Sequence, residues 1–274
     1  MEGDTIAVVI LYSPRISITH RNRPGAGSVD AVERSRVRSD TFIAEHIVQP
    51  STQAGMSVQN PYCIRYTVNG RMIARQGAMV AYRGDLTIKT KSQGVGRVLK
   101  RAVTREGLAL MEVEGRGEMW LADLAKNVFI LALAPGDGLS VTGKSVLCFD
   151  PSLQYDIRLV KGAGMTGGGL FNCVFTGDGS IAVTAHGQPM VIPVTPSQPV
   201  LVDTDAVIGW SGSLQAGIHR SESVKSLLKG GSGEAFQLSL QGEGSVIVQP
   251  SEGPLPAAKG NGGIADAVGE FLGG

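Results

Sequence analysis

An internal repeat of three segments is the feature that most restricts what this chain can fold into. In each copy a hydrophobic stretch ends in an aromatic residue, at Tyr82, Phe149 and Trp210, and leucine follows four positions later. The aromatic positions lie 67 and 61 residues apart, and a Gly-x-Gly step later in each copy recurs at nearly the same interval. Two separate landmarks with one period predict three structural units of the same kind along the chain.

Turn chemistry and composition indicate that each unit consists of β-strands. The chain has 274 residues, of which 38 are glycine and only 18% are charged, and this composition favours short strands joined by tight turns. Residues 75–78, 142–145 and 203–206 precede the hydrophobic stretches and contain glycine or aspartate, which accept turn geometry at little cost. We therefore expect an all-β fold of hairpins, with three pseudo-repeated units of the β-sandwich or double-stranded β-helix type.

We expect these units to be arranged around a pseudo-threefold axis. The third copy lacks a following hairpin, whereas the first has an extra leading segment, Tyr62 to Ala74, which would complete the last unit. Closure would pair strand edges that otherwise invite aggregation. A linear stack of units is the alternative. Two apolar and basic stretches, 94–103 and 221–228, are expected to form short helical turns.

The chain divides into an extension, a repeat domain and a tail. Residues 1–55 have little periodicity and are expected to be a loosely ordered N-terminal extension, which makes Met56 an alternative start. Residues 56–250 hold the three-repeat β domain, and residues 251–274 form a tail rich in Gly and Pro that is expected to fray. The units of the domain span roughly 62–121, 122–183 and 184–250.

Four short stretches carry a resemblance to a known family. They are residues 75–82 (RQGAMVAY), 94–101 (GVGRVLKR), 202–204 (VDT) and 240–249 (LQGEGSVIVQ). Over roughly residues 57–250 the chain resembles the altered-inheritance-of-mitochondria (number twenty-four) family. The resemblance implies a fold like that of the tryptophan RNA-binding attenuation protein, with its unit repeated three times in one chain. It implies no established enzyme activity, and a fungal mitochondrial member is linked to inner-membrane organisation.

The residue types that usually carry catalysis or bind metals form no recognisable set. The four histidines include no His-x-His pair that would suit a metal site on adjacent strands. Cys63, Cys148 and Cys173 match no zinc spacing and lie in apolar runs, which predicts buried free thiols. No Gly-x-Ser-x-Gly nucleophile elbow is present. We therefore expect no metal, no cofactor and no enzyme activity.

The Gly-x-Gly steps look superficially like nucleotide-binding loops, but their context indicates a structural role. A phosphate-binding loop opens a helix, whereas each of these steps is followed by residues typical of strands. Recurrence in every unit is characteristic of a bend or bulge in a strand. The structural repeat glycines are Gly115, Gly117, Gly177, Gly179, Gly242 and Gly244.

A basic segment in the first unit is the best candidate for a functional surface. Residues 89–105 carry six cations and no carboxylate, with apolar Val98, Leu99 and Val103 among them, and the related loops of the other units are also basic. If symmetry places these loops on one rim, they would bind an anionic surface of acidic lipid or nucleic acid. A solvated loop neutralised by nearby acids is the alternative. The residues of this basic rim are Lys89, Lys91, Arg97, Lys100, Arg101, Arg105, Lys161, Arg220, Lys225 and Lys229.

These features predict a non-enzymatic binding or scaffolding module. The expected partner is an unidentified protein or an anionic membrane surface, and self-association remains open. The expected location is the bacterial cytoplasm or the membrane periphery, because no apolar run near the N-terminus approaches the roughly 20 residues of a spanning helix. An RNA-binding module is one alternative, although the shared repeat position of Tyr82, Phe149 and Trp210 favours the core over a stacking platform. A small-molecule enzyme that uses the interior of a β unit is the other.

Overall fold

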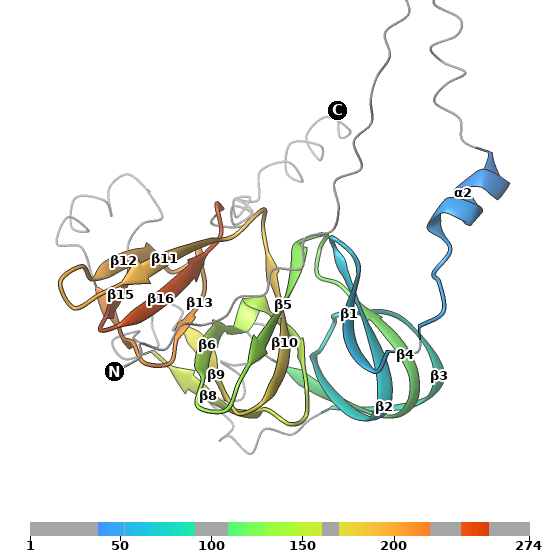
Figure 1. Cartoon of the computed structure of the whole chain (residues 1–274), viewed down its shortest axis with the longest axis horizontal. Coiled ribbons are helices and arrows are strands. Elements are labelled where there is room, and N and C mark those ends of the chain that lie inside the picture. Colours follow the sequence, from blue (N-terminus) through green and yellow to red (C-terminus); the bar gives the residue numbers. More distant parts are fainter. Residues whose placement is uncertain (1–37, 52, 91–108, 161–169, 220–236, 252–274) are drawn as a thin grey trace, which may run out of the picture.

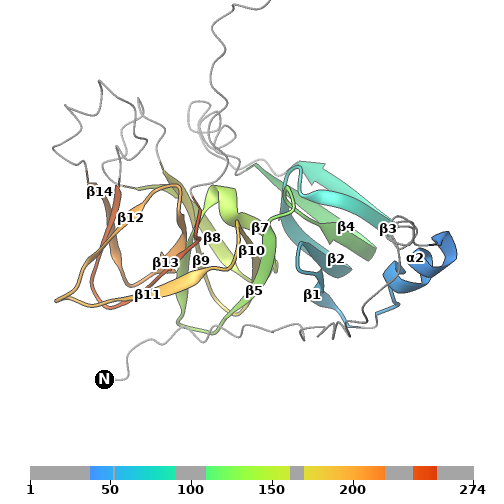
Figure 2. The same cartoon turned by 90° about the horizontal axis from the view of Figure 1, so that it is seen from above.

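The computed structural model describes residues 38–51, 53–90, 109–160, 170–219 and 237–251, and these form an almost entirely β-stranded body. Figure 1 shows three groups of strands in a row, and Figure 2 shows the same order from above. The helix α2 (Ser39–His46) buries none of its side chains and lies apart from the strands, as Figure 1 shows. Among the described residues, no helix is long and apolar enough to span a membrane.

Each group of strands forms one unit. Unit 1 contains β1 (Gly55–Asn60), β2 (Cys63–Arg75), β3 (Met79–Thr90) and β4 (Leu110–Leu121). Unit 2 contains β5 (Asn127–Leu133), β6 (Gly138–Thr142), a 3-10 turn η1 (Gly143–Ser145), β7 (Val146–Phe149), β8 (Gln154–Leu159), β9 (Phe171–Thr176) and β10 (Gly179–Ala185). Unit 3 contains β11 (Met190–Val194), β12 (Val200–Asp203), β13 (Val207–Ser211), β14 (Gln215–His219), β15 (Gln237–Gln241) and β16 (Gly244–Val248).

The three units share one pattern of antiparallel pairing. In unit 2, β10 lies between β7 and β5, and β9 lies between β8 and β6. Unit 3 repeats this arrangement, with β16 between β13 and β11 and β15 between β14 and β12. Unit 1 builds the same pattern from longer strands, because β4 lies between β3 and β2 along its whole length. The repeat seen in the sequence is therefore a repeat of strand pairing.

The Gly-x-Gly steps mark the point where the paired segments change direction. The first glycine of each step has a positive φ, +128° at Gly115, +109° at Gly177 and +117° at Gly242. β4 continues through this point, whereas the equivalent chain in the other units is divided into β9 and β10 or into β15 and β16. The second glycine permits close packing, since a Cβ at Gly179 would lie 2.6 Å from Ser152 Oγ. A side chain at either position would therefore disturb the bend.

Neighbouring units are joined by strand pairing in one fixed register. β7 of unit 2 pairs with the end of β2, so that Phe149 lies opposite Ile73. β13 of unit 3 pairs with β6 at the equivalent positions, so that Trp210 lies opposite Ser140. A side-chain hydrogen bond reinforces the first junction, because the Tyr66 hydroxyl donates to Asp150 at 2.7 Å.

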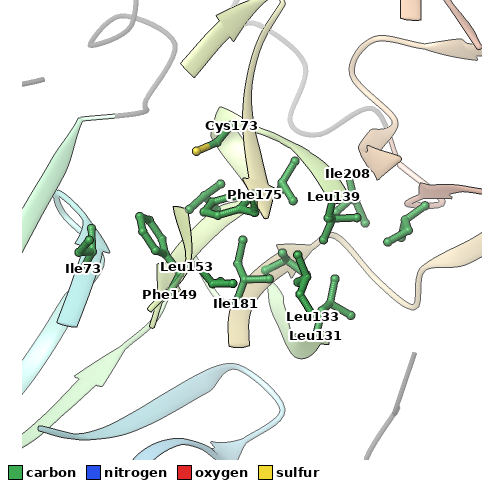
Figure 3. Packing of buried hydrophobic residues seen from close by; sticks show 14 of the residues in the cluster. Ile73, Leu131, Leu133, Leu139, Phe149, Leu153, Cys173, Phe175, Ile181 and Ile208 are labelled. Atoms are coloured by element: carbon green, nitrogen blue, oxygen red, sulfur yellow. The ribbon is translucent and has the colours of Figure 1, made fainter. Parts of the chain in front are cut away.

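Each unit has its own apolar core, and neighbouring units contribute to it. Phe149 and Phe175 are fully buried at the centre of the unit 2 core, with ring centroids 4.9 Å apart (Figure 3). Ile208 of unit 3 reaches into this core, as Figure 3 shows near Leu139. Leu147 of unit 2 belongs in the same way to the core of unit 1. The units are therefore interlocked and not merely adjacent.

The architecture confirms an all-β fold whose three sheets fit a repeated β-sandwich, and it corrects one expectation. Tyr62 to Ala74 does not complete the last unit, because β2 pairs with β1, β4 and β7. No pairing among the described strands joins unit 3 to unit 1, so the pseudo-threefold arrangement is unconfirmed and the pairings follow the linear order. The stretches 94–103 and 221–228 and the tail beyond 251 lie outside the described residues.

Candidate interaction surface

The outer edge of β3 carries apolar side chains that the repeat would place inside a protein. Val80 is 64% exposed and Tyr82 48% exposed, and Met79 beside them is also exposed. Their counterparts in β7 and β13, which include Phe149 and Trp210, are at most 2% exposed. The difference follows from topology, because β7 and β13 each pair with a strand of the preceding unit, whereas β3 is the edge strand of its sheet. We call Met79–Tyr82 the β3 edge.

Each of these three strands has a β-bulge at the same position of the repeat, and the bulge sets the direction of one residue. The register against the neighbouring strand shifts between Met79 and Ala81, which leaves Val80 as the extra residue. The same shift occurs at Leu147 in β7 and at Ile208 in β13. Those two residues are buried in the core of the preceding unit, whereas Val80 is the most exposed of the three.

Charged groups on the β3–β4 face are arranged around Glu118. This nearly buried carboxylate forms an ion pair with Arg83 and lies 3.8 Å from Arg65. The Arg83 guanidinium also lies 5.4 Å from the centroid of the Trp120 ring, within the range of a cation–π contact. These contacts hold the ends of Arg83 and Trp120 against the sheet, beside the β3 edge.

A second buried ion cluster lies at the turn between units 1 and 2. The carboxylate of Asp123 is 2.7 Å from Arg75 and 2.7 Å from Lys126, and all three side chains are largely buried. Burial raises the pKa of Asp123, but the hydrogen bonds and positive charges of Lys126 and Arg75 outweigh it and hold this pKa below its usual value. The cluster therefore stabilises the fold only while Asp123 is ionised.

Asp123→Asn is expected to lower the free energy of unfolding by about 2 kcal/mol at pH 7, because it removes charge-assisted hydrogen bonds. The folded-state pKa lies below the unfolded value of about 3.9, so the contribution is present above that value and is lost as the pH falls through the folded pKa. Urea denaturation of both proteins at pH 7 and in acid measures the difference. A destabilisation that stays constant between the two conditions would contradict the assignment.

Asp156→Asn is the matched control for this substitution. Asp156 pairs with Arg158 at 2.9 Å, but both side chains are more than half exposed. Water and salt screen such a pair, so the expected loss at pH 7 is below about 1 kcal/mol. A loss as large as that of Asp123→Asn would show that burial is not what separates the two carboxylates.

The basic rim predicted from the sequence lies almost entirely outside the described residues. Lys89 is the described member, and its ammonium group is 2.8 Å from the Glu114 carboxylate. This contact raises the pKa of Lys89 and lowers the pKa of Glu114. The other members fall in the undescribed connections β3–β4, β8–β9 and β14–β15: Lys91, Arg97, Lys100, Arg101, Arg105, Lys161, Arg220, Lys225 and Lys229.

The other residues singled out by the sequence fall into two groups. Phe149 and Trp210 are core residues as expected, but Tyr82 is not, because no preceding unit covers it. Cys148 and Cys173 are buried thiols whose pKa is raised by burial, and Cys63 is partly buried. The β3 edge itself was missed. The available signal was the absence of any earlier copy that could cover the first hydrophobic stretch.

The fold and the interlocked junctions define a class of protein: an all-β chain of three repeated sandwich units in a row. The chain belongs to the family described as Mitochondrial biogenesis AIM24, whose model matches residues 63–251. It is 27% identical over 194 residues to an uncharacterized protein of Streptococcus pyogenes serotype M6, covering 66% of this chain and 77% of the relative. A crystal structure of the protein SPYM3_0169 from Streptococcus pyogenes matches with a TM-score of 0.57 and 20% identity, covering 80% of this chain and 99% of that one.

Proposed function

We propose that this chain is a non-enzymatic scaffolding module that docks on an anionic membrane surface through three hairpin connections. The packing of the units supports a role carried by surfaces. Their interiors are filled by apolar side chains, including fully buried Phe149, Phe175 and Met119, so the outer faces and strand edges are what the described body offers to partners.

The equivalence of the three hairpins is the observation that carries this proposal. β8–β9 and β14–β15 occupy the same place in units 2 and 3, and the β3–β4 pair corresponds to them in unit 1. Their connections therefore start at equivalent strand ends, Thr90, Leu159 and His219. These connections hold nine of the 25 Lys and Arg residues, five of them in the β3–β4 connection and one, Lys161, in the β8–β9 connection. Each Lys or Arg near an anionic bilayer contributes about 1 kcal/mol, so several weak sites in one row would add up.

Sedimentation of the full chain with lipid vesicles tests the docking. The protein is expected to bind vesicles that contain an anionic lipid at low salt, to release at high salt, and not to bind vesicles of zwitterionic lipid alone. Replacing Arg97, Lys100 and Arg101 together by glutamate is expected to reduce the bound fraction at least tenfold, because it reverses three charges in one connection.

A charge-retaining variant is the matched control. Arg97→Lys, Lys100→Arg and Arg101→Lys change the same three positions without changing their charge, so binding is expected to persist. Vesicle binding that survives the glutamate variant, or that ignores salt, would contradict docking through these connections. Circular dichroism of all three proteins confirms that each is folded.

A further inference from the structure

Each junction between units pairs two kinds of strand edge. At the two ends of the row of units, one edge of each kind has no partner among the described strands. At the first junction β2 pairs with β7, and at the second junction β6 pairs with β13. β7 and β13 carry the repeated aromatic residues Phe149 and Trp210, and we call β3, β7 and β13 the aromatic strands. Among the described strands, β3 has no partner on its outer edge and β12 has none on the side away from β15. β3 is the aromatic strand of unit 1, and β12 is the unit 3 counterpart of β2 and β6.

The exposed side chains on these two edges match in register. At both internal junctions the aromatic residue lies opposite the same position of the partner strand, Ile73 in β2 and Ser140 in β6. The equivalent position in β12 is Leu201, which pairs with β15 as Ser140 pairs with β9. Leu201 is 53% exposed, and its counterpart Ile73 is 2% exposed. Leu201 and Tyr82 are therefore placed to lie opposite each other across a third junction of the same kind.

The bulged residue of the aromatic strand is the second feature that fits a junction between β3 and β12. Leu147 and Ile208 each enter the core of the unit before them, where they are 0% and 1% exposed. Val80 has the same bulge but no unit before it within the chain. In a junction with β12, Val80 would enter the core of a unit 3, which contains Val202 and Leu238. Val80 and Leu201 would then both leave water, as their counterparts do.

We propose that the β3 edge of one copy pairs with the β12 edge of a second copy, and so continues the row of units from chain to chain. The contact would join β14, β15 and β12 of one chain to β3 and β4 of the next in one sheet, as β13 and β6 join two units inside the chain. A second copy is favoured over another partner because the chain itself contains this junction twice. The charged residues of β3, which are Arg83, Asp85 and Lys89, all follow Met79–Tyr82, so no charged side chain lies within the β3 edge itself to oppose pairing.

The contact is head-to-tail, and this determines how it is tested. Val80→Asp blocks the β3 edge but leaves β12 free, whereas Leu201→Asp blocks β12 but leaves the β3 edge free. In native mass spectrometry without lipid, the wild type is expected at two or more times the single-chain mass, and each variant alone as a single chain. An equimolar mixture of the two variants is expected to give a species of two chains and nothing larger, because only one good pair of edges remains.

Leu124→Asp is the matched control, because it also replaces an exposed leucine by aspartate but lies in the turn after β4 and not in β3 or β12. It is expected to assemble like the wild type. A single-chain mass for the wild type at every concentration, or a mixture of folded variants that stays monomeric, would overturn the proposal. Since no lipid is present, failure here is distinct from failure of membrane docking, which the vesicle experiment measures.

Discussion

Replacing Phe149 by alanine is expected to lower the free energy of unfolding by about 3–5 kcal/mol, the usual range for deleting a buried phenylalanine. Phe149 is fully buried and makes edge-to-face contacts with Tyr155 and Phe175, at ring-centroid distances of 5.0 and 4.9 Å. It also pairs with Ile73 across the junction with unit 1. Its removal therefore leaves a cavity at the centre of one unit and weakens the contact with the next.

Tyr82→Ala is the control, because Tyr82 occupies the same repeat position but is half exposed. Its expected cost is below about 1 kcal/mol, in the range for surface substitutions away from special contacts. Both substitutions are made in the Leu201→Asp background, so that assembly through the β3 edge does not add to the stability of Tyr82. Urea denaturation gives the two losses. Equal losses would mean that the two positions are not buried differently.

The strands were predictable because the signals for them are local. A hydrophobic stretch after a glycine- or aspartate-containing turn predicts a hairpin wherever it occurs, and β7 and β13 form where this pattern predicts them. The repeat then extends a single prediction to three units. The burial of Phe149 and Trp210 follows from the same pattern, because each has an earlier unit to cover it.

The pairing between units was not predictable in the same way. Whether Tyr82 is buried depends on a strand that lies next to it in space, and no residue near it in the sequence carries that information. The same limit explains the error about Tyr62 to Ala74. Its residues predict a strand but do not say which strand it pairs with, and it pairs within unit 1 and not with unit 3. For the surface, charge identified the basic connections, but edges such as Met79–Tyr82 become visible only when the strand order is known.

Gly115→Ala is expected to destabilise the chain by about 4 kcal/mol, from two additive causes. A non-glycine residue at such a φ costs roughly 1–3 kcal/mol, and forcing an atom into a packed site costs roughly another 1–3 kcal/mol. Gly115 has a φ of +128°, and a Cβ there would collide with the backbone carbonyl oxygen of Asp85 in the neighbouring strand. That oxygen is part of the backbone of β3 and cannot rotate away as a side chain can, so only a shift of β3 relative to β4 would relieve the collision.

Gly70→Ala separates the two causes, because Gly70 lies directly opposite Gly115 in the β2–β4 register. Its φ is +113°, but nothing lies within 4 Å of the position a Cβ would take. This variant is expected to lose only the conformational part, roughly 1–3 kcal/mol. The difference between the two variants, measured by urea denaturation, gives the energy of the close approach between β3 and β4. If Gly70→Ala costs as much as Gly115→Ala, backbone conformation alone accounts for the glycine, and the Gly-x-Gly step is not a packing device.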